Sequence, residues 1–317
     1  MPEVPAADAP TTDSAGWRDP VPLPPTRFPG VAIRVRALLG LPVAVTDHAQ
    51  VLDWIDARVE AARAKRAAAS AEALPGDPAR LPDGDVGRRG RTGDYICVTA
   101  VHATMTAQEQ PALKAAIRDS SFAIPDGQPV AWGLRALGEP IERRVYGPDL
   151  MAYQAERAAE RGHRWFLYGG RDSDPTALQR LIDRLQARHP GLQIVGSHRP
   201  VFRPLTESEQ DEVVAMINAT EADVVWCGLG APRQEVWMQQ LRDRLEPAVL
   251  VGVGAAFDFH AGIVSQAPRW MQERGLEWAY RLSREPRRLF VRYAKYNPWY
   301  VAAFGRQWLG EKLRKKA

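Results

Sequence analysis

An aspartate and two arginines stand out near the middle of the chain. An apolar run ends at Ile124 and is followed, after one proline, by Asp126 and Gly127; a Trp-bearing helical pattern then leads to Arg143 and Arg144. An Asp-Gly pair after an apolar run is typical of a turn, because Gly adopts positive φ at low cost and Asp hydrogen-bonds to its own backbone. A carboxylate at a strand end, together with arginines that have no obvious acidic partner, also suits transfer from a phosphorylated donor. This segment alone leaves both interpretations open.

Glycines also follow three other apolar runs. Each of these loops could be a plain strand-to-helix turn, but together with Asp126-Gly127 they favour a binding site. In the stretch 228–235, GLGAPRQE, glycine lets a ligand approach the backbone, and free N–H groups at the helix that follows Pro232 attract phosphate. The glycines of the three loops are Gly169 and Gly170, Gly228 and Gly230, and Gly252 and Gly254.

The chain lacks the signatures of several enzyme classes. Neither G-x-G-x-x-G nor G-x-x-x-x-G-K-[ST] occurs, which disfavours an NAD(P)-dependent oxidoreductase and a P-loop nucleotide site, and G-x-S-x-G is absent too. The six histidines form no H-x-x-x-H or H-x-H pair, so we expect neither a metal site nor a cofactor. Asp172 and Asp174 have D-x-D spacing, which we interpret as a helix cap. Transfer from a phosphorylated donor remains the favoured chemistry.

The elements that must position these loops are short apolar strands that alternate with helices. Continuous apolar strands separated by helices predict a mainly parallel sheet covered on both faces, a Rossmann-like α/β sandwich. In such sheets ligands bind outside the carboxyl ends of the strands, where the four loops would meet. The expected strands are 95–101, 165–169, 192–196, 223–230 and 248–254, and the expected helices include 174–187, 206–219 and 232–245.

The rest of the chain suggests a core with two appendages. We expect a disordered tail over 1–28, an α/β core over 29–274 with a flexible insertion at 72–93, and a helical appendage over 275–317. Thr46 and Asp47 are predicted to cap a helix at the start of the core. Cys97 and Cys227 lie within apolar runs and are expected in the core. Without a spanning helix or the pattern of a signal peptide, the protein is expected in the cytoplasm.

The appendage carries the basic charge of the chain. Residues 276–317 contain eleven Lys or Arg and three Glu, a net charge of +8, so the remainder carries −4. Aromatic residues interleave with these cations, which suits single-stranded nucleic acid, an anionic membrane surface, or a core helix with a solvated face. Trp and Tyr prefer the lipid headgroup level and basic residues are attracted to anionic lipid, which favours the membrane. A non-catalytic nucleic-acid-binding protein stays as the alternative.

Several motifs in order resemble the WecG/TagA/CpsF glycosyltransferases, glycosyltransferase family 26. They are the stretch 94–149, the GLGAPRQE loop, VGVGAAFDFHAGIVSQAPRWMQERGLEW (251–278) and YRLSREPRRLFVRY (280–293), and the resemblance runs from about 31 to 309. It implies inverting transfer from a UDP-sugar to an undecaprenyl-diphosphate-linked saccharide, without an essential metal, at the inner face of the cell membrane. The expected sugar is N-acetylmannosamine, its uronic acid or glucuronic acid. Homo-oligomers are possible.

The resemblance also assigns roles to residues. Asp126 matches the proposed catalytic base in P-D-G, and Arg144 matches an arginine that would meet charge on the leaving diphosphate. Asp149 follows the family, although a helix cap explains it as well. An Asn common shortly after the threonine at 99 is missing, so its contact is lost or passes to His102, and Gln266 replaces a common Arg. The expected substrate-binding residues are Thr99, His102, Gly127, Gly169, Gly170, Gly228, Gly230, Gln234, Asp258, Arg281, Arg288 and Arg292.

Overall fold

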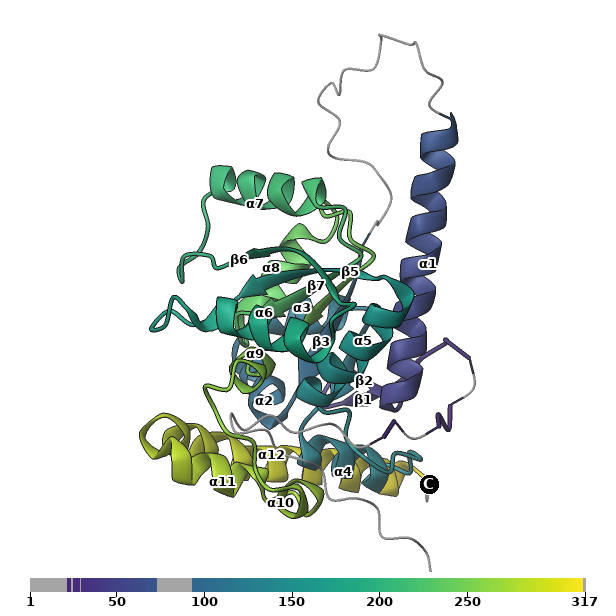
Figure 1. Cartoon of the computed structure of the whole chain (residues 1–317). Coiled ribbons are helices and arrows are strands. Elements are labelled where there is room, and N and C mark those ends of the chain that lie inside the picture. The colour runs from purple at the N-terminus through teal and green to yellow at the C-terminus, as the bar shows by residue number, and fades with distance from the viewer. Residues whose placement is uncertain (1–21, 24, 29, 73–92, 316–317) are drawn as a thin grey trace, which may run out of the picture.

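An eight-stranded, mainly parallel sheet forms the centre of the molecule (Figure 1). The computed structural model describes residues 22–23, 25–28, 30–72 and 93–315, so the predicted disordered tail and insertion fall almost entirely outside the described residues. The strand order is β1-β2-β4-β3-β8-β7-β5-β6, and among the described strands β1 and β2 alone pair antiparallel. The Rossmann-like prediction is confirmed. The strands are β1 (Arg34–Leu38), β2 (Leu41–Val45), β3 (Asp94–Thr99), β4 (Phe122–Pro125), β5 (Arg164–Gly169), β6 (Gln193–His198), β7 (Val224–Gly228) and β8 (Val249–Gly252).

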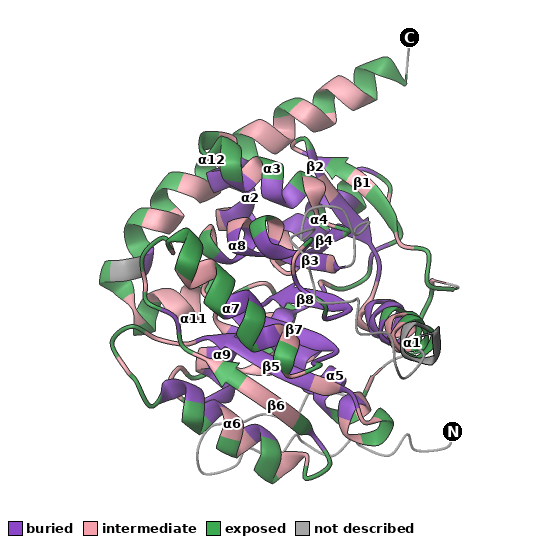
Figure 2. Cartoon of the chain, turned by 90° about the horizontal axis from the view of Figure 1, so that it is seen from above, coloured by how far each residue is buried: buried purple, intermediate pink, exposed green. Residues whose placement is uncertain are grey.

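Helices cover both faces of the sheet, with buried residues concentrated along the strands between them (Figure 2). One core packs against α1, α5, α6 and α9, and the other against α2, α3, α4, α7 and α8. The helices are α1 (His48–Glu72), α2 (Val101–Glu109), α3 (Pro111–Asp119), α4 (Gln128–Ala136), α5 (Gly147–Arg161), α6 (Ala177–Arg188), α7 (Glu207–Ala219), α8 (Arg233–Leu241), α9 (Ala256–His260), α10 (Arg269–Glu273), α11 (Glu277–Arg284) and α12 (Pro286–Arg314).

The two cores follow from the period of two along each strand. In β3, Ile96 belongs to the first core, whereas Tyr95 and Cys97 belong to the second. Cys227 of β7 joins Cys97 there, and both thiols are fully buried, as expected. Because both faces are covered, the strands are apolar without interruption, which explains why they were readable in the sequence.

The long helix α1 is fixed at its start and along its side. Asp47 Oδ1 accepts a 2.9 Å hydrogen bond from the backbone N–H of Gln50, which confirms the predicted cap. Further along, Arg63 and Arg66 donate to the fully buried carboxylate of Asp223 at 2.5 and 2.6 Å. A buried carboxylate needs such partners, so the two arginines and Asp223 tie α1 to the start of β7.

The β1–β2 hairpin was not expected from the sequence. Its two-residue turn is Leu39-Gly40, with φ of 51° and 78°, the left-handed conformation of tight hairpin turns. The Leu39 N–H donates to Gln307 Oε1 at 2.8 Å, and its carbonyl accepts from Gln108 Nε2 at 3.0 Å. The turn therefore meets both α2 and the far end of α12.

The C-terminal segment lies along one edge of the molecule as α10, α11 and α12 (Figure 1). Helix α12 packs against α2. The Tyr300 hydroxyl donates to the Pro129 carbonyl at 3.0 Å, and Trp308 Nε1 donates to the Ala136 carbonyl at 3.2 Å. Within the described residues, no helix has the length and apolar character needed to cross a membrane.

Candidate active site

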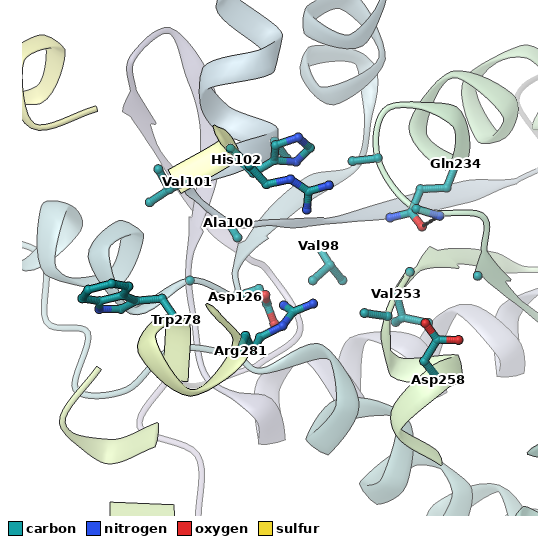
Figure 3. A pocket seen from close by; sticks show the side chains of 18 of the residues that line it. Val98, Ala100, Val101, His102, Asp126, Gln234, Val253, Asp258, Trp278 and Arg281 are labelled. Carbon is teal, nitrogen blue, oxygen red and sulfur yellow. Dashed lines mark hydrogen bonds between the residues drawn. The ribbon is translucent and has the colours of Figure 1, made fainter. Parts of the chain in front are cut away.

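A cavity of about 720 Å³ lies where the carboxyl ends of the strands face α11 and α12. Its walls come from the loops after β3, β4, β5, β7 and β8 and from the C-terminal helices (Figure 3). The side chain of Arg288 lies outside the described part of the chain. The predicted site residues that line the cavity are His102, Asp126, Gly127, Arg144, Gly170, Gly228, Gly230, Gln234, Asp258, Arg281 and Arg292.

Thr99 and Gly169 are not among the lining residues. Successive side chains of a strand point to opposite faces, and in β3 it is Val98 that lines the cavity. The Thr99 carbonyl instead accepts a 3.1 Å hydrogen bond from the backbone N–H of Asp126. A Cβ on Gly169, whose φ is 139°, would lie 2.6 Å from the carbonyl carbon of Gly228. These two residues shape the strand ends rather than contact the cavity.

Asp126 follows β4 directly and is half-buried. Its Oδ1 accepts a 2.7 Å hydrogen bond from the backbone N–H of Gly147, the first residue of α5. Burial raises the pKa of Asp126 above the ordinary aspartate value, although Arg144 and the Gly147 N–H oppose this shift. A carboxylate that is oriented and has a raised pKa is suited to accept a proton.

Arg144 differs from its sequence interpretation, because it has an acidic partner. Its Nη2 donates to Oε2 of Glu277 at 2.5 Å, and its guanidinium lies 4.1 Å from the centroid of the Tyr146 ring. Its Nη1 donates to the backbone carbonyl of Asp126 at 3.3 Å. The Tyr146 hydroxyl donates to the other oxygen of Glu277 at 3.0 Å. Sequence reasoning missed Glu277, although it lies in the GLEW segment that carries the family resemblance.

Gln234 lies at the start of α8 and is held from two sides. Its Oε1 accepts the backbone N–H of Gly230 at 3.0 Å, and its Nε2 donates to Oε1 of Glu235 at 2.9 Å. Glu235 is fully buried, and burial raises its pKa to about 7. The sequence analysis overlooked Glu235, which directly follows Gln234 in the quoted loop. Glu235 therefore supports the Gly-rich loop through Gln234.

Two arginines lie on the same side as the Gly-rich loops. Arg171 Nη1 is 3.8 Å from Oδ2 of Asp258. Arg233 Nη1 donates to the carbonyl of Phe202 at 3.2 Å, and its guanidinium lies 5.4 Å from the centroid of that ring. Phe202 and both arginines line the cavity but were not singled out from the sequence. Phe202 had no sequence signal, since it lies in an irregular loop after β6.

The C-terminal helices close the remaining side. The ring of His102 meets the Tyr296 ring edge to face, with centroids 5.4 Å apart. Burial and the charge of Arg292 lower the pKa of His102 to about 4, so it is neutral near pH 7. Figure 3 shows Arg281 and Asp126 near one another, with Gln234 across the cavity. The core and the appendage therefore contribute to one site.

The lining carries five arginines and four carboxylates, a balance that favours an anionic ligand such as a diphosphate. The arginines are Arg144, Arg171, Arg233, Arg281 and Arg292, and the carboxylates are Asp126, Asp172, Asp258 and Glu277. Among the described residues, no group of three or more His, Cys, Asp or Glu is placed to hold a metal ion.

Two aspartates interpreted as helix caps lie elsewhere. Asp149 is inside the first turn of α5, whose N-cap position is Tyr146. Asp174 precedes α6 by three residues, and its Oδ1 accepts the backbone N–H of Thr176 at 3.0 Å. Asp174 therefore stabilises the turn before the helix, while Asp149 places an acidic group at a helix N-terminus, where the helix dipole favours it.

Comparison with known proteins identifies the family of the chain. The model of the "Glycosyl transferase WecG/TagA/CpsF family" matches residues 85–314, well over half of the chain. The N-acetylglucosaminyldiphosphoundecaprenol N-acetyl-beta-D-mannosaminyltransferase of Bacillus spizizenii is 30% identical over 196 residues, which cover 62% of this chain and 73% of that protein. The chain belongs to the WecG/TagA/CpsF family of glycosyltransferases.

Proposed function

We propose that this protein is a metal-independent, inverting glycosyltransferase that moves N-acetylmannosamine from its UDP donor to an undecaprenyl-diphosphate-linked saccharide, in the biosynthesis of a cell-surface polysaccharide. The name of the Bacillus relative supports the sugar and the acceptor. The observation that carries the reaction is the oriented carboxylate of Asp126, which lines the cavity together with Arg144 and Arg281 and is influenced by the charge of both.

Asp126 acts as the general base. Its Oδ1 is engaged by the Gly147 N–H, so Oδ2 receives the proton of the acceptor hydroxyl as that oxygen attacks the anomeric carbon. The attacking oxygen forms the new glycosidic bond on the face opposite UDP, and the bond to the diphosphate oxygen breaks. Inversion follows from this single displacement. A positioned base contributes roughly 10²–10⁴ to such a rate.

The arginines of the cavity stabilise the leaving diphosphate. Arg144 is held beside the base, and Arg281 and Arg292 reach the cavity from α11 and α12. Charge-assisted hydrogen bonds from guanidinium groups to phosphate oxygens are strong, and they strengthen as charge develops on the leaving group. We assign Arg288 of α12 to these phosphate-binding arginines on the family resemblance alone.

The donor occupies the side of the cavity formed by the Gly-rich loops. Gly228 and Gly230 leave room for backbone contact with the diphosphate, and Gln234 and Asp258 offer polar groups to the nucleoside and sugar. The saccharide acceptor enters from the opposite side, near His102, where the C-terminal helices face the core. The two substrates then meet at Asp126.

The exposed side of α12 suits the inner surface of the cell membrane, where a lipid-linked acceptor lies. Its apolar side chains are highly exposed, from 55% for Leu309 to 69% for Val291. Phe290, Val301 and Leu313 of the same helix are exposed as well, and lysines and arginines are interspersed among these apolar residues. An amphipathic helix of this kind binds a lipid surface without spanning it. The family match does not support the alternative of a nucleic-acid-binding protein.

The test is UDP release from a panel of UDP-N-acetylmannosamine, its uronic acid and UDP-glucuronate. Each donor is assayed in EDTA, with and without a polyprenyl-diphosphate-linked N-acetylglucosamine acceptor. We expect acceptor-dependent release, with UDP-N-acetylmannosamine the best donor. Release that EDTA abolishes and Mg²⁺ restores would contradict the metal independence. No release from any donor, in a protein that does not bind UDP by calorimetry, would contradict the whole proposal.

A further inference from the structure

Glu277 is a buried carboxylate at the end of the cavity where Asp126 and Arg144 lie, called the catalytic end below. It begins α11 and is 8% exposed, and each of its oxygens accepts a hydrogen bond from a side chain of the core. Arg144 Nη2 donates to Oε2 at 2.5 Å, and the Tyr146 hydroxyl donates to Oε1 at 3.0 Å. Removing a carboxylate from water is costly, so its placement between these two donors is a specific feature of the site.

The effect of Glu277 falls on Arg144. The guanidinium is fixed from three directions: by Glu277, by the ring of Tyr146 at 4.1 Å, and by the backbone carbonyl of Asp126 at 3.3 Å. The two hydrogen bonds of Arg144 go to Glu277 and to the backbone carbonyl of Asp126, and neither goes to the Asp126 carboxylate. Besides Glu277, the carboxylate that attracts Arg144 is that of Asp126, so without the Glu277 charge Arg144 would be drawn toward Asp126. A base paired with arginine is a weaker base.

We propose that Glu277 is a positioning residue of the transfer reaction, which holds Arg144 in place for the leaving diphosphate and keeps its charge away from the carboxylate of Asp126. The inference rests on the proposed function for the roles of Arg144 and Asp126. Because Glu277 belongs to α11 and its two partners belong to the loop before α5, the catalytic end is complete only when α11 is docked on the core.

The charges around Asp126 give this role a signature in the pH dependence. Arg144 and Arg281 lower the pKa of Asp126 and Glu277 raises it, in addition to the larger effect of burial and the opposing Gly147 N–H. The neighbouring groups on α5 and its preceding loop are Tyr146 and Asp149. Removing the Glu277 charge lowers the pKa of Asp126, and a shift of Arg144 toward Asp126 would lower it further.

The experiment compares Glu277→Gln, which keeps shape and hydrogen-bonding capacity without charge, with Tyr146→Phe, which keeps the charge but removes one hydrogen bond. Glu273→Gln is the matched control, because this exposed glutamate of α10 forms its ion pair with Arg269 of the same helix. For Glu277→Gln we expect kcat to fall by on the order of 10- to 100-fold with no rise in the donor KM. The acidic limb of kcat/KM should move to lower pH.

The other two variants define the specificity of the effect. Tyr146→Phe should lose a few-fold in kcat with the acidic limb in place, and Glu273→Gln should match the wild type. Calorimetry with UDP gives a readout that does not need turnover. UDP carries the charge that the leaving group acquires, and without Glu277 the guanidinium of Arg144 is drawn toward Asp126, so UDP should bind several-fold more weakly to Glu277→Gln than to the wild type or to Glu273→Gln.

Three results would overturn the inference. They are wild-type kcat in Glu277→Gln, an acidic limb that does not move although kcat falls, and UDP affinity that is unchanged or tighter. The last two would indicate that Glu277 only fastens α11 to the core. A wild-type protein that binds UDP but transfers no sugar would instead contradict the proposed function, and the UDP titration would still decide whether Glu277 controls the charge at Arg144.

Discussion

Oδ1 of Asp126 lies 2.7 Å from the backbone nitrogen of Gly147, the first residue of α5. The end of one strand and the start of a distant helix are thereby joined through the carboxylate itself. The N-terminus of a helix favours negative charge, while burial of Asp126 disfavours it. The balance leaves a carboxylate with a fixed orientation and a raised pKa, which is the basis of the first two predictions.

Asp126→Asn should lower kcat by roughly 10²–10⁴, because the amide keeps the shape of the side chain but cannot take a proton. UDP affinity by calorimetry should change less than threefold. Asp183→Asn is the control, since this aspartate is exposed on α6 and bonds to Gln179 of the same helix. Turnover by Asp126→Asn near the wild-type rate would exclude Asp126 as the base.

The pH dependence of kcat/KM should show an acidic limb at a higher pH than the ionisation of an ordinary aspartate. The base must be ionised, so activity is lost as pH falls through its pKa, and burial raises that pKa above the usual aspartate value of about 3.9. A second carboxyl group near Asp126, that of Asp149, has a pKa raised to about 6 by burial and could also produce an acidic limb. The limb should therefore persist in Asp149→Asn. A limb that disappears in that variant would assign it to Asp149 instead.

A triple variant, Phe290→Glu, Val301→Glu and Leu309→Glu, should bind vesicles that contain anionic lipid more weakly by roughly 100-fold or more. Each wild-type side chain is expected to bury apolar area at the lipid surface worth on the order of 1 kcal/mol. Co-sedimentation measures this directly, and added salt should weaken the wild-type binding. Met216→Glu on α7 is the control, an exposed apolar residue of the core. Equal binding by the triple variant would contradict the membrane assignment of α12.

Asp223→Asn should reduce the free energy of unfolding by on the order of 3 kcal/mol, because it leaves Arg63 and Arg66 without their buried partner. The value is at the low end for a buried pair, since Arg63 is 39% exposed. Urea denaturation should show a lower midpoint with an unchanged slope. Asp211→Asn, which breaks an exposed pair with Arg244, should have little effect.

The same carboxylate gives the stability a pH dependence. Burial would raise the pKa of Asp223, but hydrogen bonds from Arg63 and from the Arg164 backbone outweigh it, so the pKa is lowered in the folded state. Such a group stabilises the fold above its unfolded pKa, near 4, and the gain is lost as pH falls through the lower folded value. The difference between the wild type and Asp223→Asn should therefore shrink below pH 4.

The strands and the position of Asp126 at a strand end were readable from the sequence because local chemistry determines them. A sheet covered on both faces makes its strands apolar throughout, and the Asp-Gly pair marks the end of β4. The β1–β2 hairpin was missed, because its turn uses Leu39 where Asn or Gly is usual, and contacts from Gln307 and Gln108 hold it. Those contacts are tertiary and leave no local pattern.

The composition of the site was less predictable than its location. Whether Val98 or Thr99 faces the cavity depends on the pairing of β3 with its neighbours, which a strand pattern does not give. Arg144 and Glu277 are 133 positions apart, and their pairing depends on the docking of α11. Long-range ion pairs of this kind form only once the chain has folded. The sequence analysis therefore found no acidic partner for Arg144.

The cavity has one wall that the α/β core does not supply. Trp278, Arg281, Arg292 and Tyr296 all reach it from α11 and α12. A variant truncated after residue 274 would therefore lack this wall, and its cavity would be open to solvent on that side. Inhibitor screens on such a truncated protein would overlook compounds that bridge the Gly-rich loops and α11, and these are the compounds that the intact enzyme holds on every side.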